Sequence, residues 1–319
     1  MTLYPGASAV GARLDTRPPF HLEATVRVLQ RRPGNLVDVW SDDRYLRVFQ
    51  TGDDLVLVEV ANRGTVDVPD VRWRVREGTV SSATRAALTR TIRDILGLDV
   101  DPEPLQRLTE AEPRLRSTAL ALRGMRPPRF PELFEAFANV IPFQQLSLDA
   151  GVIIVGRLVK RFGASLEHEG RRFHAFPTAG VVARGSLESL RACGLSVRKS
   201  ESLRRIARAI DSGELSEGIL SDLGTADGLA MLAALPGIGP WSAGLVLLRG
   251  LRRLDVFPAG DVGAERGLRT LLRKSEQAPL TRIVARFGDY RGYLYFCALG
   301  GSLIGKGLIH PPRPELVPR

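Results

Sequence analysis

The chain has 319 residues, 44% apolar and 25% charged, which is enough to bury a sizeable core and is an ordinary composition for a soluble protein. Its 45 Lys and Arg residues outnumber its 35 Asp and Glu residues, for a net charge of +10, and all but four of the 45 are arginines. Because arginine forks onto phosphate oxygens, this balance favours a nucleic acid as partner. Two distant cysteines and four scattered histidines exclude a zinc finger, a four-cysteine iron–sulfur cluster and a disulfide scaffold.

The chain carries no sign of a membrane segment. No apolar run approaches the ~18 residues that a membrane span needs, and the N-terminus lacks the charged-then-apolar pattern of a signal peptide. We therefore expect a cytoplasmic protein, associated with the nucleoid and without a membrane partner.

The N-terminal part predicts an antiparallel sheet. After a loose arm over about residues 1–15, apolar and polar residues alternate over 22–29, 45–49, 55–60 and 71–75. A period of two with β-branched residues is typical of half-buried strands, and turn residues such as Pro33-Gly34-Asn35 separate these segments. From Ser81 to Gly97 the apolar spacing becomes helical, which adds at least one helix to cover the sheet.

After about residue 100, nearly all of the chain is predicted to be helical. Asp101-Pro102 and Pro131 each open a short helix, and a long apolar-rich stretch runs from Gln145 to Phe162. Further helical segments lie at 186–194, 201–210, 227–235, 241–251, 262–273 and 290–300. The Pro-rich tail at 310–314 cannot be helical. The predicted fold is α+β: an N-terminal α/β accessory domain at 1–115, then an all-α region at 116–319 with two helical subdomains that flank a cleft.

The stretch Leu235-Pro236-Gly237-Ile238-Gly239-Pro240-Trp241 is the most informative in the chain. A helix ends before Pro236, two glycines allow a tight turn, and Pro240 is typical of the first position of a new helix. The amides of such a turn, with the N-terminus of the following helix, bind anions such as phosphate. A turn of this kind also serves simply to join two helices, but the basic charge of the chain favours the phosphate-binding interpretation.

A carboxylate follows at Asp261, the last residue of the segment DVFPAGD and twenty residues after Trp241. Asp261 stands where the N-cap of the next helix is expected, so its carboxylate is suited to accept hydrogen bonds from the first helical amides. A helix N-terminus also stabilises negative charge, which suits a group that must face developing positive charge in a reaction. Asp261 is therefore a capping residue, a catalytic residue, or both.

These segments resemble the signature of a known enzyme superfamily. LPGIGPWSA followed by DVFPAGD is similar to the helix-hairpin-helix and catalytic-aspartate motif of the Gly/Pro…Asp DNA glycosylases, and more narrowly of the 3-methyladenine DNA glycosylase II branch, which repairs alkylated DNA. Gln144-Gln145-Leu146-Ser147, FPT at 176–178, GLSVRKSESLRRIA at 194–207 and Tyr290-Arg291-Gly292-Tyr293 match as well. The resemblance covers about residues 120–300, and the N-terminal part fits the accessory α/β domain of the family in outline.

The resemblance implies an enzyme that flips a damaged nucleotide out of the duplex and hydrolyses its N-glycosidic bond. Asp261 matches the catalytic aspartate, which stabilises the oxocarbenium-like sugar or orients the attacking water. The turn Gly237-Ile238-Gly239 would hold a DNA phosphate beside the lesion. In the family a Na⁺ or K⁺ ion can sit on hairpin carbonyls, which in this chain are those of Ala233, Leu235 and Ile238. No cofactor is required, and the missing cysteine quartet separates the chain from the iron–sulfur members of the superfamily.

Trp241 occupies the position where relatives that also cleave the DNA strand carry a lysine nucleophile. Because tryptophan forms no Schiff base, we expect a monofunctional glycosylase. Its indole would stack on a flipped, positively charged alkylpurine, or else pack between helices in the core. Gln145 would line the lesion site, or simply be a polar residue at a helix start. Leu146 matches the apolar wedge that fills the gap left by the flipped base, with core packing as the alternative.

The predicted base pocket departs from the family at two positions. Leu245 and Leu299 stand where the alkylation branch often has a tyrosine and a tryptophan, so we expect this pocket to be less aromatic and its substrate range to be shifted. Arginines near the hairpin are candidate phosphate contacts, with solvated surface as the alternative for any single one. They are Arg249, Arg252, Arg253 and Arg266.

We therefore expect a monomeric enzyme that removes alkylated bases of the 3-methyladenine and 7-methylguanine type from double-stranded DNA in base excision repair. One alternative is the same scaffold with specificity for deaminated or oxidised purines. Another is a non-catalytic helix-hairpin-helix protein that only clamps DNA, and a third is a small-molecule enzyme whose basic charge is incidental. A pure clamp has no use for a carboxylate at Asp261, so this residue distinguishes the enzyme from the clamp.

Overall fold

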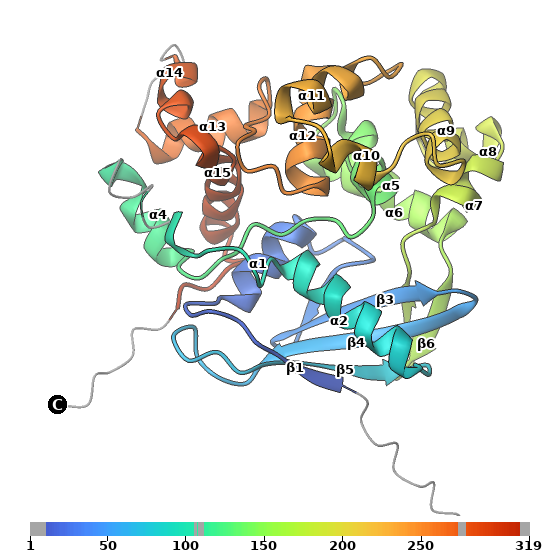
Figure 1. Cartoon of the computed structure of the whole chain (residues 1–319), viewed down its shortest axis with the longest axis horizontal. Helices are drawn as coiled ribbons and strands as arrows, with labels where there is room; N and C mark the ends of the chain where they lie inside the picture. The colour runs from blue at the N-terminus through green and yellow to red at the C-terminus, as the bar shows by residue number, and fades with distance from the viewer. Residues whose placement is uncertain (1–10, 105–106, 108–111, 274–278, 313–319) are drawn as a thin grey trace, which may run out of the picture.

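The computed structural model describes residues 11–312, except 105–106, 108–111 and 274–278. Its N-terminal part is a five-stranded antiparallel sheet in the order β1-β5-β4-β3-β2 (Figure 1). The strands are β1 (Gly11–Leu14), β2 (Val39–Ser41), β3 (Arg44–Thr51), β4 (Asp54–Asn62) and β5 (Val71–Glu77). The predicted strands at 45–49, 55–60 and 71–75 are thus confirmed. β1 lies in the segment that we expected to be a loose arm, of which residues 1–10 are outside the described residues.

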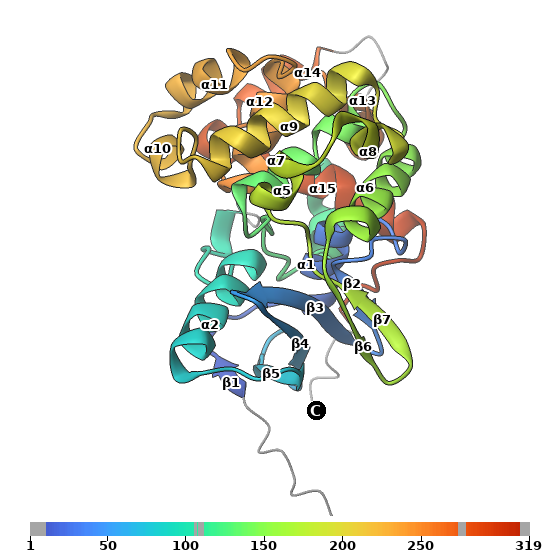
Figure 2. The same cartoon turned by 90° about the vertical axis from the view of Figure 1, so that its right-hand side faces the viewer.

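The predicted strand at 22–29 is wrong, because this segment forms helix α1 (Leu22–Gln30). Its N-cap is His21, whose Nδ1 accepts a hydrogen bond from the amide of Ala24 at 3.3 Å. α1 lies between the sheet and the C-terminal helices (Figures 1 and 2), and seven of its nine residues are buried. The two residues of α1 that are not buried, Glu23 and Arg27, are four positions apart, so the segment also carries a helical period that the strand prediction overlooked.

The two faces of the sheet are covered by different elements. Helix α2 (Ser82–Leu96), predicted from its spacing, lies on the face that carries Val58 and Trp73, and a hairpin of β6 (Ser165–His168) and β7 (Arg171–His174) lies on the other face (Figure 2). Val48, Leu57 and Phe173 form a small core beneath this hairpin. The β6–β7 hairpin corrects the expectation that nearly all of the chain after residue 100 is helical.

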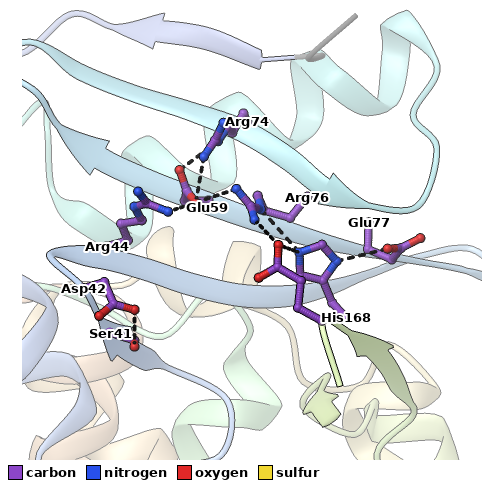
Figure 3. A network of polar contacts seen from close by, with 9 residues as sticks. Ser41, Asp42, Arg44, Glu59, Arg74, Arg76, Glu77 and His168 are labelled. Atoms are coloured by element: carbon purple, nitrogen blue, oxygen red, sulfur yellow. Dashed lines mark hydrogen bonds and ion pairs between the residues drawn. The ribbon is translucent and has the colours of Figure 1, made fainter. Parts of the chain in front are cut away.

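Polar contacts fasten this hairpin to the sheet (Figure 3). Arg76 of β5 forms ion pairs with Glu59 of β4 at 3.4 Å and with Glu169, in the turn between β6 and β7, at 2.8 Å. Glu59 also pairs with Arg74 of β5 at 2.8 Å and Arg44 of β3 at 3.4 Å, within the sheet. His168 of β6 lies 3.1 Å from a carboxylate oxygen of Glu77. The β6–β7 hairpin is therefore tied to the N-terminal sheet by side chains of β5.

In the remaining described chain the regular elements are helices, except for β6 and β7, and these helices lie above the sheet in Figure 1. The α-helices are α4 (Arg116–Ala121), α5 (Leu133–Ala138), α6 (Leu148–Phe162), α7 (Ala179–Arg184), α8 (Leu187–Ala192), α9 (Val197–Asp211), α10 (Glu217–Ser221), α11 (Thr225–Ala233), α12 (Pro240–Gly250), α13 (Val262–Leu271), α14 (Leu280–Ala285) and α15 (Gly292–Gly305). Three short 3₁₀ helices are η1 (Pro113–Leu115), η2 (Ile141–Phe143) and η3 (Gly288–Tyr290). Among the described helices, none has the length and apolar character to cross a membrane.

A buried ion-pair network joins the sheet to the helical part. The guanidinium of Arg47 on β3 contacts Asp38 at 2.7 Å and Glu135 of α5 at 2.5 Å, and the hydroxyl of Tyr45 donates to Asp38 at 2.8 Å. Burial raises the pKa of Glu135 to about 7, against the opposing effect of Arg47. One continuous hydrophobic core runs through both parts of the molecule, so the helices that carry the candidate site rest on the N-terminal elements.

Two sequence predictions fall partly outside the described residues. The helix expected from Asp101-Pro102 runs into residues 105–106 and 108–111, and the tail at 310–314 runs past Pro312. The described part of the tail is not helical and is tied to α1, since the backbone amide of His310 donates to Glu23 at 3.2 Å.

Candidate DNA interface and active site

The predicted helix-hairpin-helix is formed by α11, α12 and the turn of residues 234–239 that joins them. α12 begins at Pro240 with Gly239 as its N-cap, and Gly237 has a φ of 87°, which favours glycine. The amide of Ile238 donates to the carbonyl of Leu235 at 3.0 Å. Ile238 is buried whereas Gly237 and Gly239 are exposed, so the turn is anchored by its middle side chain and presents both glycines to solvent. The first amides of α12 have no acceptor within the helix and lie at the same end of it, which is an arrangement that binds phosphate.

Asp261 is the N-cap of α13, as its position in the sequence predicts. Its Oδ1 accepts a hydrogen bond from the amide of Ala264 at 2.8 Å. Its Oδ2 accepts a second bond from Nε1 of Trp241 at 3.1 Å. Both side chains are half-buried. The carboxylate therefore points back from α13 toward the start of α12, beside the hairpin.

The loop between η2 and α6 reaches the same place, although it lies about a hundred residues earlier in the chain. Nε2 of Gln144 donates to the carbonyl of Gly237 at 2.8 Å and to Oγ of Ser242 at 3.0 Å. The two following residues form the tip of the loop. Gln145 is exposed with a φ of 57°, and the apolar side chain of Leu146 is 45% exposed. An exposed leucine on a tight loop argues against the core-packing alternative for Leu146.

The two predicted leucines of the base pocket differ in position. Leu245 lies one turn after Trp241 on α12 but is only 3% exposed and packs in the main core. It supports this region from within and presents no open surface to a base, which corrects its assignment to the pocket wall. Leu299 on α15 is half-buried at the border of the same core.

The prediction that Arg249 contacts DNA is wrong. Its side chain is 1% exposed and lies between the rings of Phe130 and Phe296, with the guanidinium 4.9 and 5.8 Å from their centres. The guanidinium donates to the carbonyls of Val28 and Leu29, near the C-terminus of α1. These carbonyls lie at the negative end of the helix dipole, which explains how the core accommodates this cation.

Two of the other three candidate arginines also bind backbone carbonyls of the protein. Arg252 donates to the carbonyl of Pro127 and contacts Asp94, and Arg253 donates to carbonyls at the end of α10, including Leu220 at 3.0 Å. Arg266 on α13 is exposed and remains a candidate phosphate contact. Closeness to the hairpin in sequence therefore did not predict which arginines face solvent.

Arg31 is a buried cation that the sequence did not mark. It follows α1 with a φ of 62°, and its guanidinium donates to the backbone and side-chain oxygens of Asn139 at 3.2 and 3.0 Å. The guanidinium lies 4.6 Å from the ring centre of Phe143, just before the loop that carries Leu146. Burial lowers the pKa of Arg31 to about 10, with a further lowering by Arg249, and Asp261 is among the groups that oppose this shift. Arg31 follows a segment that the sequence predicts to be a strand, and we find no local signal that would have identified it.

Of the three carbonyls that are predicted to hold a monovalent cation, that of Leu235 accepts the amide of Ile238 at 3.0 Å. Ala233 ends α11, so its carbonyl has no partner within the helix and lies at the negative end of the helix dipole. The carbonyls of Leu235 and Ile238 follow in the turn. Among the described residues, no cluster of three or more His, Cys, Asp or Glu side chains is placed to hold a metal ion.

Comparison with family models divides the chain into two matched segments. Residues 138–286 match the model described as HhH-GPD superfamily base excision DNA repair protein, and residues 12–132 match the AlkA N-terminal domain. A DNA-3-methyladenine glycosylase from Bacillus subtilis is 32% identical over 282 residues, which are 87% of this chain and 92% of that protein. DNA-3-methyladenine glycosylase 2 of Escherichia coli is 25% identical over 78% of this chain and 83% of its own length.

Solved structures agree with these matches. A 3-methyladenine DNA glycosylase from Archaeoglobus fulgidus superposes with a TM-score of 0.74 and 27% identity, over 92% of this chain and 99% of that one. An 8-oxoguanine glycosylase/lyase from Clostridium acetobutylicum, solved with double-stranded DNA, has a TM-score of 0.70 and 16% identity over 93% of this chain and 98% of its own. The second likeness extends to the fold alone.

Proposed function

Because this chain belongs to the DNA-3-methyladenine glycosylase family of the HhH-GPD superfamily, we propose that it is a monofunctional DNA glycosylase. Its substrates are flipped-out alkylated bases of the 3-methyladenine and 7-methylguanine type in double-stranded DNA. Its product is an abasic site for base excision repair. We also propose that it acts as a monomer in the cytoplasm, on the chromosome.

The observation that carries this proposal is the hydrogen bond from Trp241 to Asp261. It places an aromatic ring and a carboxylate side by side next to a phosphate-binding turn. A flipped alkylpurine carries positive charge and a flat face, and both suit an indole. Its sugar gains positive charge as the base leaves, and this suits a carboxylate. A protein that only clamps DNA has no use for this pair.

In the proposed reaction the bond between C1′ of the sugar and the ring nitrogen of the base breaks, and its electron pair leaves with the base. A cationic alkylpurine thus departs as a neutral base. Asp261 stabilises the oxocarbenium-like sugar electrostatically, and a water oxygen then bonds to C1′. The water gives up one proton, to Asp261 or to solvent, and the abasic sugar keeps a hydroxyl group.

The grip on DNA comes from elements around this centre. The amides at Gly237 and Gly239 and the start of α12 would bind a phosphate of the damaged strand. A Na⁺ or K⁺ ion on the carbonyls of Ala233, Leu235 and Ile238 would add positive charge at that phosphate. Leu146 would enter the stack where the base has left, and Gln145 would lie beside it.

A base-release assay tests the function directly. Duplexes that carry 3-methyladenine, 7-methylguanine, hypoxanthine or 8-oxoguanine are incubated with the wild-type protein, and the free base is measured. We expect release of the two methylated bases, without strand breaks unless alkali is added. Release of hypoxanthine or 8-oxoguanine alone would assign the scaffold to another lesion class. Strand breaks without alkali would contradict the monofunctional mechanism.

A further inference from the structure

The loop that carries Gln145 and Leu146 is held in place by side chains from distant parts of the chain. Phe143, immediately before it, is buried, whereas Gln145 and Leu146 are exposed. Gln145 has a φ of 57°, a conformation that costs free energy for a residue with a Cβ and persists only where the surroundings enforce it. The contacts around the loop therefore identify what enforces its shape.

The shortest of these hydrogen bonds comes from Lys199, in the first turn of α9. Its Nζ donates to the carbonyl of Gln144 at 2.6 Å and to the carbonyl of Pro142 at 3.2 Å. The side chain is half-buried, and burial lowers its pKa. Two of the three ammonium donors are thus directed at the backbone of the protein, at the base of the loop.

The same loop is tied to the hairpin through Gln144. Its backbone carbonyl accepts from Lys199, and its side-chain amide donates to the carbonyl of Gly237 and to Oγ of Ser242. Gly237 in turn is packed against α9, since a Cβ added to it would lie 2.0 Å from Oγ of Ser202. The loop, the hairpin turn and α9 therefore form one closed set of contacts.

The back of the loop is equally confined. The guanidinium of Arg31 lies 4.6 Å from the ring centre of Phe143. On α6, a Cβ added to Gly151 would lie 2.2 Å from the same ring. Phe143 is thus held between a guanidinium and α6 on one side of the loop, and the polar contacts of Lys199 and Gln144 hold the other side.

We propose that Lys199 and Gln144 are positioning residues. They hold the loop of residues 144–147, which we call the wedge loop, at a fixed place beside the phosphate-binding hairpin. The inference rests on the proposed function, because it concerns how that enzyme stabilises the flipped state. While these hydrogen bonds are formed, the distance between two parts of the site stays fixed. One part is the hairpin that binds the phosphate backbone, and the other is the pair of side chains that enter the base stack. The binding energy of the phosphate contact is then available for insertion of the wedge, since little loop ordering remains to be done.

A different role for Lys199 makes a different prediction. A lysine that binds a DNA phosphate contributes to all DNA binding, whatever the sequence or damage, and its removal lowers the salt dependence of binding by about one counterion. A positioning lysine leaves binding to undamaged DNA unchanged and affects only complexes in which the wedge is inserted.

The experiment uses a duplex with a tetrahydrofuran abasic site opposite 2-aminopurine, whose fluorescence rises when its stacking is disrupted by the wedge. This reads insertion without any bond cleavage, so it remains informative if the methylated bases prove not to be substrates. Variants of the full chain are Lys199→Met, Lys199→Arg and Gln144→Glu, which replaces a donor by an acceptor at the carbonyl of Gly237. Lys160→Met is the matched control, because Lys160 is an exposed lysine on α6.

We expect Lys199→Met and Gln144→Glu each to reduce the fluorescence rise at saturating protein at least fivefold. Affinity for undamaged duplex should stay within twofold of wild type in Lys199→Met, whereas the new carboxylate of Gln144→Glu beside the hairpin should weaken it, so that variant is compared at saturation only. Lys199→Arg should restore most of the signal, and Lys160→Met should match wild type. The double variant should be no worse than either single variant, because the two residues act on one loop. If Lys199→Met does not fold, Gln144→Glu decides alone.

Two results would overturn the proposal. One is an unchanged fluorescence rise in folded Lys199→Met and Gln144→Glu. The other is an equal loss of affinity for damaged and undamaged duplex with a reduced salt dependence in Lys199→Met, which would make Lys199 a phosphate contact. Failure of the proposed function has a separate signature, since the wild-type protein would then insert its wedge at the abasic site but release no methylated base.

Discussion

Nε1 of Trp241 donates a hydrogen bond to Oδ2 of Asp261 across 3.1 Å, and Oδ1 of the same carboxylate caps α13 through the amide of Ala264. The carboxylate is thereby fixed by two donors from two different helices. Both donors are neutral N–H groups, so they orient the carboxylate without placing a cation against it, and a sugar that becomes positive can supply that charge. This geometry separates the capping role of Asp261 from its proposed catalytic role.

The substitution Asp261→Asn separates the two roles experimentally. Asparagine is as good an N-cap as aspartate, but its Nδ2 cannot accept the hydrogen bond from Trp241, so we expect only a small fall in the thermal unfolding midpoint, of the size of one lost hydrogen bond at a half-buried site. The charge is lost, and the single-turnover rate of 7-methylguanine release should fall by about a hundredfold to a thousandfold. Wild-type release rates in a folded Asp261→Asn protein would remove Asp261 from the mechanism.

Trp241→Phe tests the contact to the carboxylate without removing the aromatic face. A hydrogen bond to a charged group is worth about 1.5–3 kcal/mol, so the release rate should fall by about tenfold to a hundredfold. Trp241→Ala also removes the stacking surface and should be slower still and weaker in substrate binding. Equal rates for wild type, Trp241→Phe and Trp241→Ala would leave Trp241 a purely structural residue.

Arg249 is buried whereas Arg266 is exposed, so we predict opposite effects of their substitution on stability and on DNA binding. Arg249→Ala leaves a cavity between Phe130 and Phe296 and two unpaired carbonyls, so we expect a loss of about 3 kcal/mol in the free energy of unfolding. The salt dependence of DNA binding by the folded protein should not change. Arg266→Ala, at an exposed position on α13, should instead leave stability within about 0.5 kcal/mol and lower the salt slope by about one. Urea unfolding and binding titrations at several salt concentrations measure both quantities.

The two hairpin glycines differ in what a side chain would meet. Gly237→Ala introduces a Cβ 2.0 Å from Oγ of Ser202 at a φ of 87°, so the turn must distort. We expect a loss of about 2 kcal/mol in stability and at least tenfold weaker binding to an abasic-site duplex. Gly239→Ala is the matched control for stability, because no atom lies within 4 Å of its added Cβ and its φ is −96°. An undistorted, fully stable Gly237→Ala protein would contradict the packing described here.

His21 predicts a pH dependence of stability. Its Nδ1 accepts from the amide of Ala24, so Nε2 carries the proton and donates to the carbonyl of His310 at 3.0 Å. Burial lowers the pKa of His21 below 6.5, against smaller opposing effects of the His310 carbonyl and Glu23. The folded protein thus prefers the neutral ring, and its stability should fall as the pH drops below about 6.5, where the unfolded chain takes up the proton.

The control for His21 is His21→Asn, which keeps a capping side chain that does not titrate. Thermal unfolding is followed from pH 8 to pH 5 for both proteins. The difference in unfolding midpoint between them should depend on pH below 6.5 and be constant above it. A difference that does not change with pH would show that His21 does not titrate on unfolding.

Several parts of the fold were predictable because their signals are local. The strands at 45–49, 55–60 and 71–75 alternate over residues that pair with immediate neighbours in the chain. The hairpin is marked by its glycines and Pro240, and the start of α13 by Asp261. Each of these features depends on residues within one or two turns, so the sequence expresses it directly.

The errors arise where burial depends on distant elements. The segment 22–29 fits a strand by its alternation and a helix by the spacing of Glu23 and Arg27, and its enclosure between the sheet and the C-terminal helices shows that the helix forms. Arginine is a residue type that usually lies at the surface, but Arg249 is surrounded by the end of α1 and two aromatic rings. No local pattern encodes such an environment.

The sequence by itself determined the basic charge, the hairpin, the carboxylate at Asp261 and the absence of a lysine at position 241. These are chemical identities, and they select the family and the proposed reaction. The tertiary structure alone decided which of these groups meet: Trp241 with Asp261, Gln144 with Gly237, and Lys199 with the wedge loop. The reason is physical, since hydrogen bonds between residues 20 to 93 positions apart depend on how helices pack, and packing is set by the whole core.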